Sequence, residues 1–183
     1  LDASEENAVT KVLEEAVAEV AGRYHEDLAP AIERVWRREI EDLHVDLRGW
    51  IRKLVAAEEA WRPARFELGF GLSRAREPSD AGASGEPLDA ARVLGGKRLR
   101  GRVDLVEEDL AGKALRVTDH KTGKSPKLKR LVVGGGKTLQ PVLYSLAMEH
   151  LLGRPVESGR LFFCTRRGRY ATLEVALDDH SRD

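Results

Sequence analysis

Two acidic residues and a lysine are spaced so that they could serve one site. Asp119 and Lys121 stand two positions apart in Val117-Thr118-Asp119-His120-Lys121. Because a β-strand points alternate side chains to the same face, both would lie on one side of a sheet. Asp104 ends a similar stretch at 99–104, and a hairpin between the two stretches would bring it beside Asp119.

Two neighbouring carboxylates repel each other unless a cation lies between them, and hard oxygen ligands favour Mg²⁺ or Mn²⁺ over zinc. A nearby lysine could position or help deprotonate a metal-bound water, or neutralise charge that builds on a phosphate. An isolated Asp-x-Lys pair is more often a solvated ion pair, so the motif needs support. Gly101, inside the first stretch, indicates close approach by backbone or ligand. Gln140 and Tyr144 stand four apart and would share a helical face.

Three segments, in this order, resemble consecutive motifs of RecB-type nucleases in the PD-(D/E)XK superfamily. They are Gly-Arg-Val-Asp at 101–104, Val-Thr-Asp-His-Lys-Thr-Gly at 117–123 and Leu-Gln-Pro-Val-Leu-Tyr at 139–144. The resemblance covers about residues 65 to 165. It implies a restriction-endonuclease-like α/β core, with a central mixed sheet flanked by helices, that hydrolyses DNA phosphodiester bonds with Mg²⁺ or Mn²⁺.

The resemblance also implies roles for single residues. Asp104, Asp119 and the backbone carbonyl of His120 would hold the metal, Lys121 would handle the water, and Gln140 with Tyr144 would steer the nucleic-acid strand. Glu67 matches an acidic position that the family places on the preceding strand, and it is either a further metal ligand or a surface glutamate.

The chain departs from the family pattern at several points. Val103 replaces the proline of the superfamily's name, and aspartate replaces glutamate at 119, changes common in RecB-like members. The family's glycine-x-x-x-histidine motif is one residue too short at Gly22–His25, so His25 is expected to be an ordinary helix histidine. The chain begins with Leu1, which suggests a piece of a longer protein with that motif upstream. One cysteine, Cys164, cannot build a four-cysteine iron–sulfur cluster and is expected in the core.

Basic residues gather around 121–137, in a loop rich in lysine and glycine. Beyond Lys121 these are Lys124, Lys127, Lys129, Arg130 and Lys137. They could bind a phosphate backbone, or they could form a solvated loop. A shorter basic turn at 166–169 could contact DNA or only solvent. The Gly-Gly-Gly-Lys-Thr run at 134–138 is not a phosphate-binding loop, because residue 131 is leucine where that motif requires glycine.

The periodicity of apolar residues predicts the elements that must position these groups. Apolar residues at spacings of three and four predict a pair of long helices, from about 4 to 28 and from Pro30 to about 57. Strands are expected at 65–72, 97–106, 113–119, 160–165 and 170–177, and a helix at 139–152. Glycine and proline predict a long loop at 73–96, and 107–112 is expected to be an acidic hairpin connection. Three tryptophans, Trp36, Trp50 and Trp61, are expected to pack against the sheet.

Composition bounds the remaining possibilities. At 183 residues, with 42% apolar residues, the chain is expected to form one domain, with a helical pair at 1–60 and an α/β catalytic core at 61–183. Its formal net charge of zero means that any basic surface must come from local clustering. No run predicts a membrane span or a signal peptide, so a cytoplasmic location is expected.

The sequence therefore predicts a metal-dependent deoxyribonuclease. The resemblance implies a role in DNA recombination or repair, with DNA as a partner and a helicase or other parts of a longer polypeptide as further candidate partners. The alternative is a non-catalytic DNA-binding or scaffolding module that keeps the nuclease fold. A helical interaction platform at 4–57 is a third reading.

Overall fold

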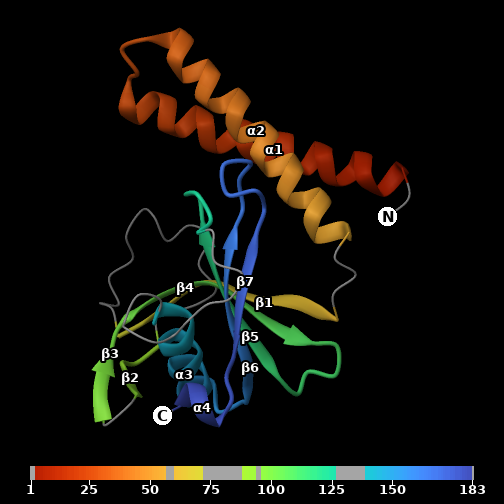
Figure 1. Cartoon of the computed structure of the whole chain (residues 1–183). Coiled ribbons are helices and arrows are strands. Elements are labelled where there is room, and N and C mark those ends of the chain that lie inside the picture. Colours follow the sequence, from red (N-terminus) through yellow and green to blue (C-terminus); the bar gives the residue numbers. More distant parts are fainter. Residues whose placement is uncertain (1–2, 57–59, 72–87, 94–95, 127–138, 183) are drawn as a thin grey trace.

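A computed structural model of the chain describes residues 3–56, 60–71, 88–93, 96–126 and 139–182. Figure 1 shows two long helices lying across one end of an α/β core. In these ranges no helix combines the length and apolar character that crossing a bilayer requires. The assignment of the whole chain to a single domain stays a prediction.

The helices and strands follow one another in a mixed order. The helices are α1 (Ala3–Leu28), α2 (Glu33–Ala56), α3 (Gln140–Leu152) and α4 (Asp179–Arg182). The strands are β1 (Trp61–Phe70), β2 (Ala91–Val93), β3 (Lys97–Leu99), β4 (Gly101–Asp109), β5 (Leu115–Lys121), β6 (Val156–Phe163) and β7 (Thr172–Ala176).

Five strands form the central sheet in the order β1-β4-β5-β6-β7, and β2 pairs with β3 in a separate hairpin. The pairing is antiparallel everywhere in the large sheet except between β5 and β6, which are parallel. Parallel neighbours need a crossover connection, and α3 lies on that connection. The expected α/β class, with a central mixed sheet flanked by helices, is confirmed.

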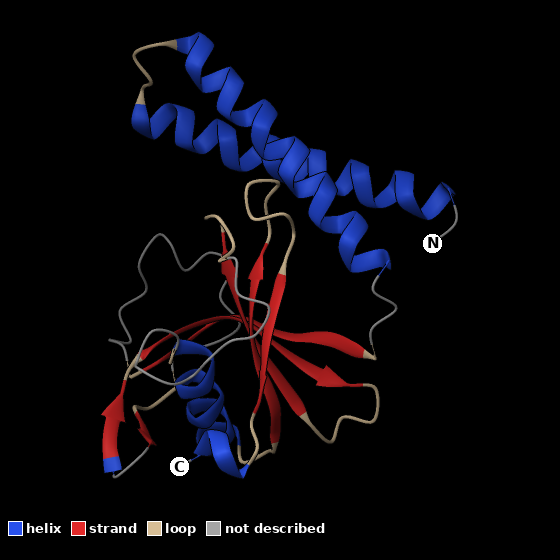
Figure 2. Ribbon diagram, viewed as in Figure 1, coloured by secondary structure: helices blue, strands red, loops and turns tan. Residues whose placement is uncertain are grey.

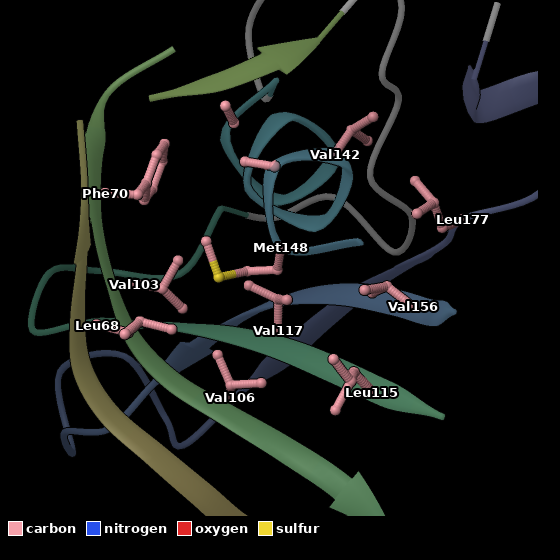
Figure 3. Close-up of a cluster of buried hydrophobic side chains, with 12 residues drawn as sticks. Leu68, Phe70, Val103, Val106, Leu115, Val117, Val142, Met148, Val156 and Leu177 are labelled. Carbon is pink, nitrogen blue, oxygen red and sulfur yellow. The ribbon is translucent and has the colours of Figure 1, made fainter. Parts of the chain in front are cut away.

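The hydrophobic core lies between the sheet and α3, as Figure 3 shows. Val117 of β5 and Met148 of α3 are both almost fully buried there. Gly159 of β6 permits the close approach of the helix, since a Cβ at this position would lie 2.4 Å from the carbonyl oxygen of Pro141 and 2.6 Å from Ser145 Oγ. The helix that begins at Gln140 is therefore held tightly over the sheet.

Several expected strand limits were wrong. The first strand starts at Trp61, because Pro63 is tolerated on the edge strand β1, where the register shifts between Pro63 and Arg65. The strand expected at 97–106 divides at Arg100 into β3 and β4. The acidic connection expected at 107–112 is also wrong, because β4 continues to Asp109 and pairs with β5 along the way.

Other differences concern short or late elements. The long loop expected at 73–96 contains β2, while 72–87 and 94–95 lie outside the described residues. The strand expected from 160 begins at Val156, and the short helix α4 was not predicted. Of the expected basic loop, Lys127, Lys129, Arg130 and Lys137 lie outside the described residues.

Helix α2 joins the helical pair to the core. Arg166, in the turn between β6 and β7, donates to Asp46 through its backbone amide at 3.0 Å and through Nε at 2.9 Å, and to Asp42 through Nη2 at 2.9 Å. Figure 2 shows this turn directly beneath the helices. Arg166 thus binds α2, while it stays exposed to solvent, and contact between the basic turn at 166–169 and DNA stays a prediction. Trp36 packs edge-on against His25 within the helical pair, so its expected packing against the sheet was also wrong.

Candidate active site

Strand β5 carries the core and the candidate site on the same face. Its residues Leu115 and Val117 are buried against the core, and the same alternation places Asp119 and Lys121 on that face. The Asp119 side chain is 7% exposed and that of Lys121 is 36% exposed. The strand therefore ends in a buried acid followed by a lysine that reaches solvent.

Gln140, the first residue of α3, connects both charged groups. Its Nε2 donates to Asp119 Oδ1 at 2.6 Å, and its Oε1 accepts from Lys121 Nζ at 3.0 Å. Lys121 Nζ also lies 2.5 Å from Asp119 Oδ2. The start of the helix thus closes a triangle of three polar side chains, and the role expected for Gln140 in steering the nucleic-acid strand stays a prediction.

Asp104 lies where β4 and β5 separate. The last paired residues of the two strands are Leu105 and Thr118. Beyond them the Asp104 carboxylate, through Oδ2, accepts a 2.6 Å hydrogen bond from the backbone amide of His120. The Asp104 carboxylate thus bonds the His120 amide just beyond the last pair of the two strands. This hydrogen bond brings Asp104 alongside the segment from Asp119 to Lys121.

The surroundings of Asp119 disfavour its charged form. Burial raises the pKa of Asp119 above its ordinary value, and the charge of Asp104 raises it further, although the ammonium of Lys121 acts in the opposite direction. Burial also disfavours the charged form of His120 and so lowers its pKa, although the charge of Asp104 acts in the opposite direction. The two carboxylates therefore interact, and a positive charge between them would relieve their repulsion.

One atom of the site is well suited to a cation. Asp119 Oδ2 is buried, and the Lys121 ammonium forms an ion pair with it. A buried carboxylate that interacts with a second carboxylate fits the oxygen ligands that Mg²⁺ and Mn²⁺ take. Within the described part of the chain, no group of three or more His, Cys, Asp or Glu residues could hold a metal. Among the described residues, Asp104 and Asp119 are the two carboxylates that meet at this site.

Two of the expected site residues have other contacts. Tyr144 packs edge-on against Phe70 at 5.7 Å, and a Cβ on Gly101 would lie 2.9 Å from its Oη. The close approach expected at Gly101 is thus made by a side chain of α3. Glu67 lies half-buried on β1 with a φ of 48°. The roles expected for Tyr144 and Glu67 stay predictions.

The loop after β5 is held by the turn between β6 and β7. Thr165 Oγ1 donates to the carbonyl of Thr122 at 3.2 Å, and Cys164 N donates to the carbonyl of Lys121 at 3.1 Å. Cys164 is half-buried beside this strand end. Lys124 follows on this loop and is exposed, and its contact with a phosphate backbone stays a prediction.

A buried polar network on the opposite face of the sheet was not foreseen. Glu107 accepts from Arg116 Nε at 3.0 Å and Nη2 at 2.8 Å, from Arg160 Nη2 at 3.0 Å and from Thr118 Oγ1 at 2.7 Å. All four residues are at most 5% exposed. The sequence signal that could have revealed the network is the alternation of polar and apolar residues in β5, where Arg116 and Thr118 alternate with Leu115 and Val117. The network ties together β4, β5 and β6, which flank the candidate site.

Comparison with known proteins identifies the family of this chain. No curated protein was found to match the chain. The family model described as the PD-(D/E)XK nuclease superfamily matches residues 1–180, which include the helical pair as well as the sheet and α3. The chain therefore belongs to the PD-(D/E)XK nuclease superfamily.

Proposed function

We propose that this chain is a RecB-like deoxyribonuclease that hydrolyses DNA phosphodiester bonds with Mg²⁺ or Mn²⁺, and that it acts in DNA recombination or repair. The observation that carries the proposal is the triangle of Asp119, Lys121 and Gln140 beside Asp104. Superfamily membership supports a nuclease, and the arrangement of acids and lysine supports its dependence on metal.

Asp104, Asp119 and the carbonyl of His120 would hold the cation. When bound there, a divalent cation supplies a water of lowered pKa and neutralises charge on the phosphate. Lys121 lies at the solvent-facing side of the triangle and would orient that water or the phosphate through Nζ. Gln140 fixes the lysine and Asp119 relative to each other, so that both are in place before substrate arrives.

The distribution of charge supports a polyanionic substrate. Residues 60–183 contain 23 Lys and Arg against 16 Asp and Glu, whereas residues 1–59 contain 8 against 15. The excess of positive charge thus belongs to the sequence that forms the sheet and α3. We propose that Lys124, together with Lys127, Lys129, Arg130 and Lys137, contacts the DNA backbone, with affinity that falls as salt concentration rises.

Cleavage of end-labelled single-stranded and double-stranded DNA over a Mg²⁺ titration tests the proposal. The wild-type protein is expected to cleave only with added metal. Asp119→Asn and Lys121→Met are expected to reduce kcat by at least about 10²-fold, because each removes a group that acts on the reacting atoms. Lys113→Met, which removes an exposed lysine at the other end of the β4–β5 hairpin, is the matched control and should leave cleavage unchanged.

Two outcomes would overturn the proposal. Full activity in Asp119→Asn or Lys121→Met would remove the assigned residues from the chemistry. Salt-sensitive DNA binding by the wild type, without cleavage at any Mg²⁺ or Mn²⁺ concentration, would instead establish the non-catalytic DNA-binding module.

A further inference from the structure

The imidazole of His120 connects the candidate metal site to the helical pair. His120 lies between Asp119 and Lys121 in β5, so its ring points to the opposite face of the sheet. There it packs edge-on against Trp50 of α2, with ring centroids 5.3 Å apart, and against Phe162 of β6 at 6.0 Å. The backbone of the same residue binds Asp104 through its amide.

Helix α2 is fixed on the core near Trp50 by independent contacts. A Cβ on Gly49 would lie 2.0 Å from Tyr170 Oη, so the helix backbone approaches the β6–β7 turn as closely as glycine allows. One turn earlier, Asp46 accepts two hydrogen bonds from Arg166. Trp50 is therefore presented to His120 from a helix that is itself held in place.

We propose that Trp50 is a positioning residue for the metal site: its indole holds the His120 ring, and thereby the peptide whose amide orients Asp104 and whose carbonyl would face the cation. This inference rests on the proposed function. The helical pair then forms part of the catalytic machinery, although Trp50 itself does not touch substrate or metal. Groups that orient metal ligands in this indirect way typically change metal affinity or activity by about 10-fold to 100-fold when they are removed.

The chain contains a matched control for this proposal. Trp36 lies on the same helix and packs edge-on against another histidine, His25, with ring centroids 5.6 Å apart. Both tryptophans are half-buried, and each touches a histidine ring in the same manner. Trp36→Ala and Trp50→Ala therefore remove similar packing, but of the two histidines contacted, His120 is the one that belongs to the candidate site.

Mn²⁺ binding, followed by the paramagnetic resonance signal of the free ion, gives a readout that does not require cleavage. Trp50→Ala is expected to weaken Mn²⁺ binding by about 10-fold or more, whereas Trp36→Ala keeps wild-type affinity. The Mg²⁺ concentration for half-maximal cleavage should rise in parallel, with an unchanged KM for DNA. Trp50→Phe should keep both values nearer to the wild type than Trp50→Ala does, because it keeps an aromatic ring at this position and the indole N–H that it removes has no hydrogen-bond partner among the described residues.

The outcomes separate the two proposals. If the wild type binds Mn²⁺ and cleaves DNA, and Trp50→Ala matches Trp36→Ala in both assays, the positioning role is refuted while the nuclease assignment stands. If the wild type neither binds Mn²⁺ nor cleaves, both are refuted. Circular dichroism establishes that each variant is folded, and if Trp50→Ala does not fold, Trp50→Leu takes its place because it keeps apolar volume without a ring. Wild-type affinity in folded Trp50→Leu would also refute the role.

Discussion

Replacing Glu107 with glutamine tests how strongly the buried network holds the sheet beneath the candidate site. The carboxylate accepts four hydrogen bonds, from Arg116, Arg160 and Thr118. A glutamine amide group would turn a donor toward groups that are themselves donors, and it would remove the negative charge beside two buried guanidinium groups. The substitution therefore leaves the arginines without the carboxylate that neutralises them.

The expected cost follows from the burial of the charges. Arg116 is 4% exposed and Arg160 is 3% exposed, so water cannot replace the lost carboxylate. Breaking one partner of a buried ion pair costs about 3–5 kcal/mol. For a domain of this size each kcal/mol lowers Tm by roughly 2–4 °C, so Glu107→Gln should melt about 6–20 °C below the wild type.

Thermal unfolding followed by circular dichroism measures this difference, and the neighbouring residue provides the control. Glu108 pairs with Arg62 and Arg154, but its side chain is 23% exposed. Glu108→Gln should therefore lower Tm much less than Glu107→Gln, because solvent screens exposed ion pairs. Equal Tm values for the two variants would refute the reasoning that burial makes the Glu107 network strong.

Acid should reduce the difference between the wild type and Glu107→Gln. Burial alone would raise the pKa of Glu107, but the hydrogen bond from Arg116 and the charges of Arg160 and Arg116 outweigh it, so its pKa lies below the ordinary value of 4.5. A lowered pKa in the folded state means that the carboxylate stabilises the protein above pH 4.5 and that this contribution is lost as the pH falls through the folded value. The Tm difference should accordingly narrow on acidification below about pH 4.5.

Two further substitutions probe the candidate site without metal. Because burial and the charge of Asp104 raise the pKa of Asp119, its ionised form weakens the fold at neutral pH. Asp119→Asn should therefore raise Tm at pH 7, with a gain that vanishes as acid protonates the wild-type carboxyl; a lower Tm at pH 7 would mean that the ion pair with Lys121 dominates. Gly101→Ala should cost about 1–3 kcal/mol in urea unfolding, because its methyl group would meet Tyr144 Oη at 2.9 Å. Adding Tyr144→Phe should recover part of that loss, and strictly additive costs would contradict the contact.

The sequence was sufficient to place the candidate site because the geometry there is local. Alternation along a strand puts Asp119 and Lys121 on the face of Val117, and a hairpin brings Asp104 beside them. The helix that starts at Gln140 was expected from its own periodicity, and its contact with the acid and the lysine follows from the crossover between parallel strands.

The features that sequence reasoning missed depend on partners far away in the chain. Glu107 was expected in a turn because charged residues usually face solvent, but its burial in a strand is made possible by Arg116 and by Arg160, which lies 53 positions later. Helical periodicity likewise shows which face of α2 is apolar, but it does not show that Trp50 meets a histidine of β5 while Trp36 does not.

The hydrogen bond from the His120 amide to Asp104 makes one backbone proton a local reporter. Most strand amides are released only when neighbouring strands separate, but this proton is released when a single carboxylate rotates away. Its exchange with deuterium should therefore be faster than that of Val117, which lies in the paired part of the same strand. An ion that draws the Asp104 carboxylate toward itself would change the exchange rate of the His120 amide. Hydrogen exchange at this one amide would therefore report whether the metal site is occupied.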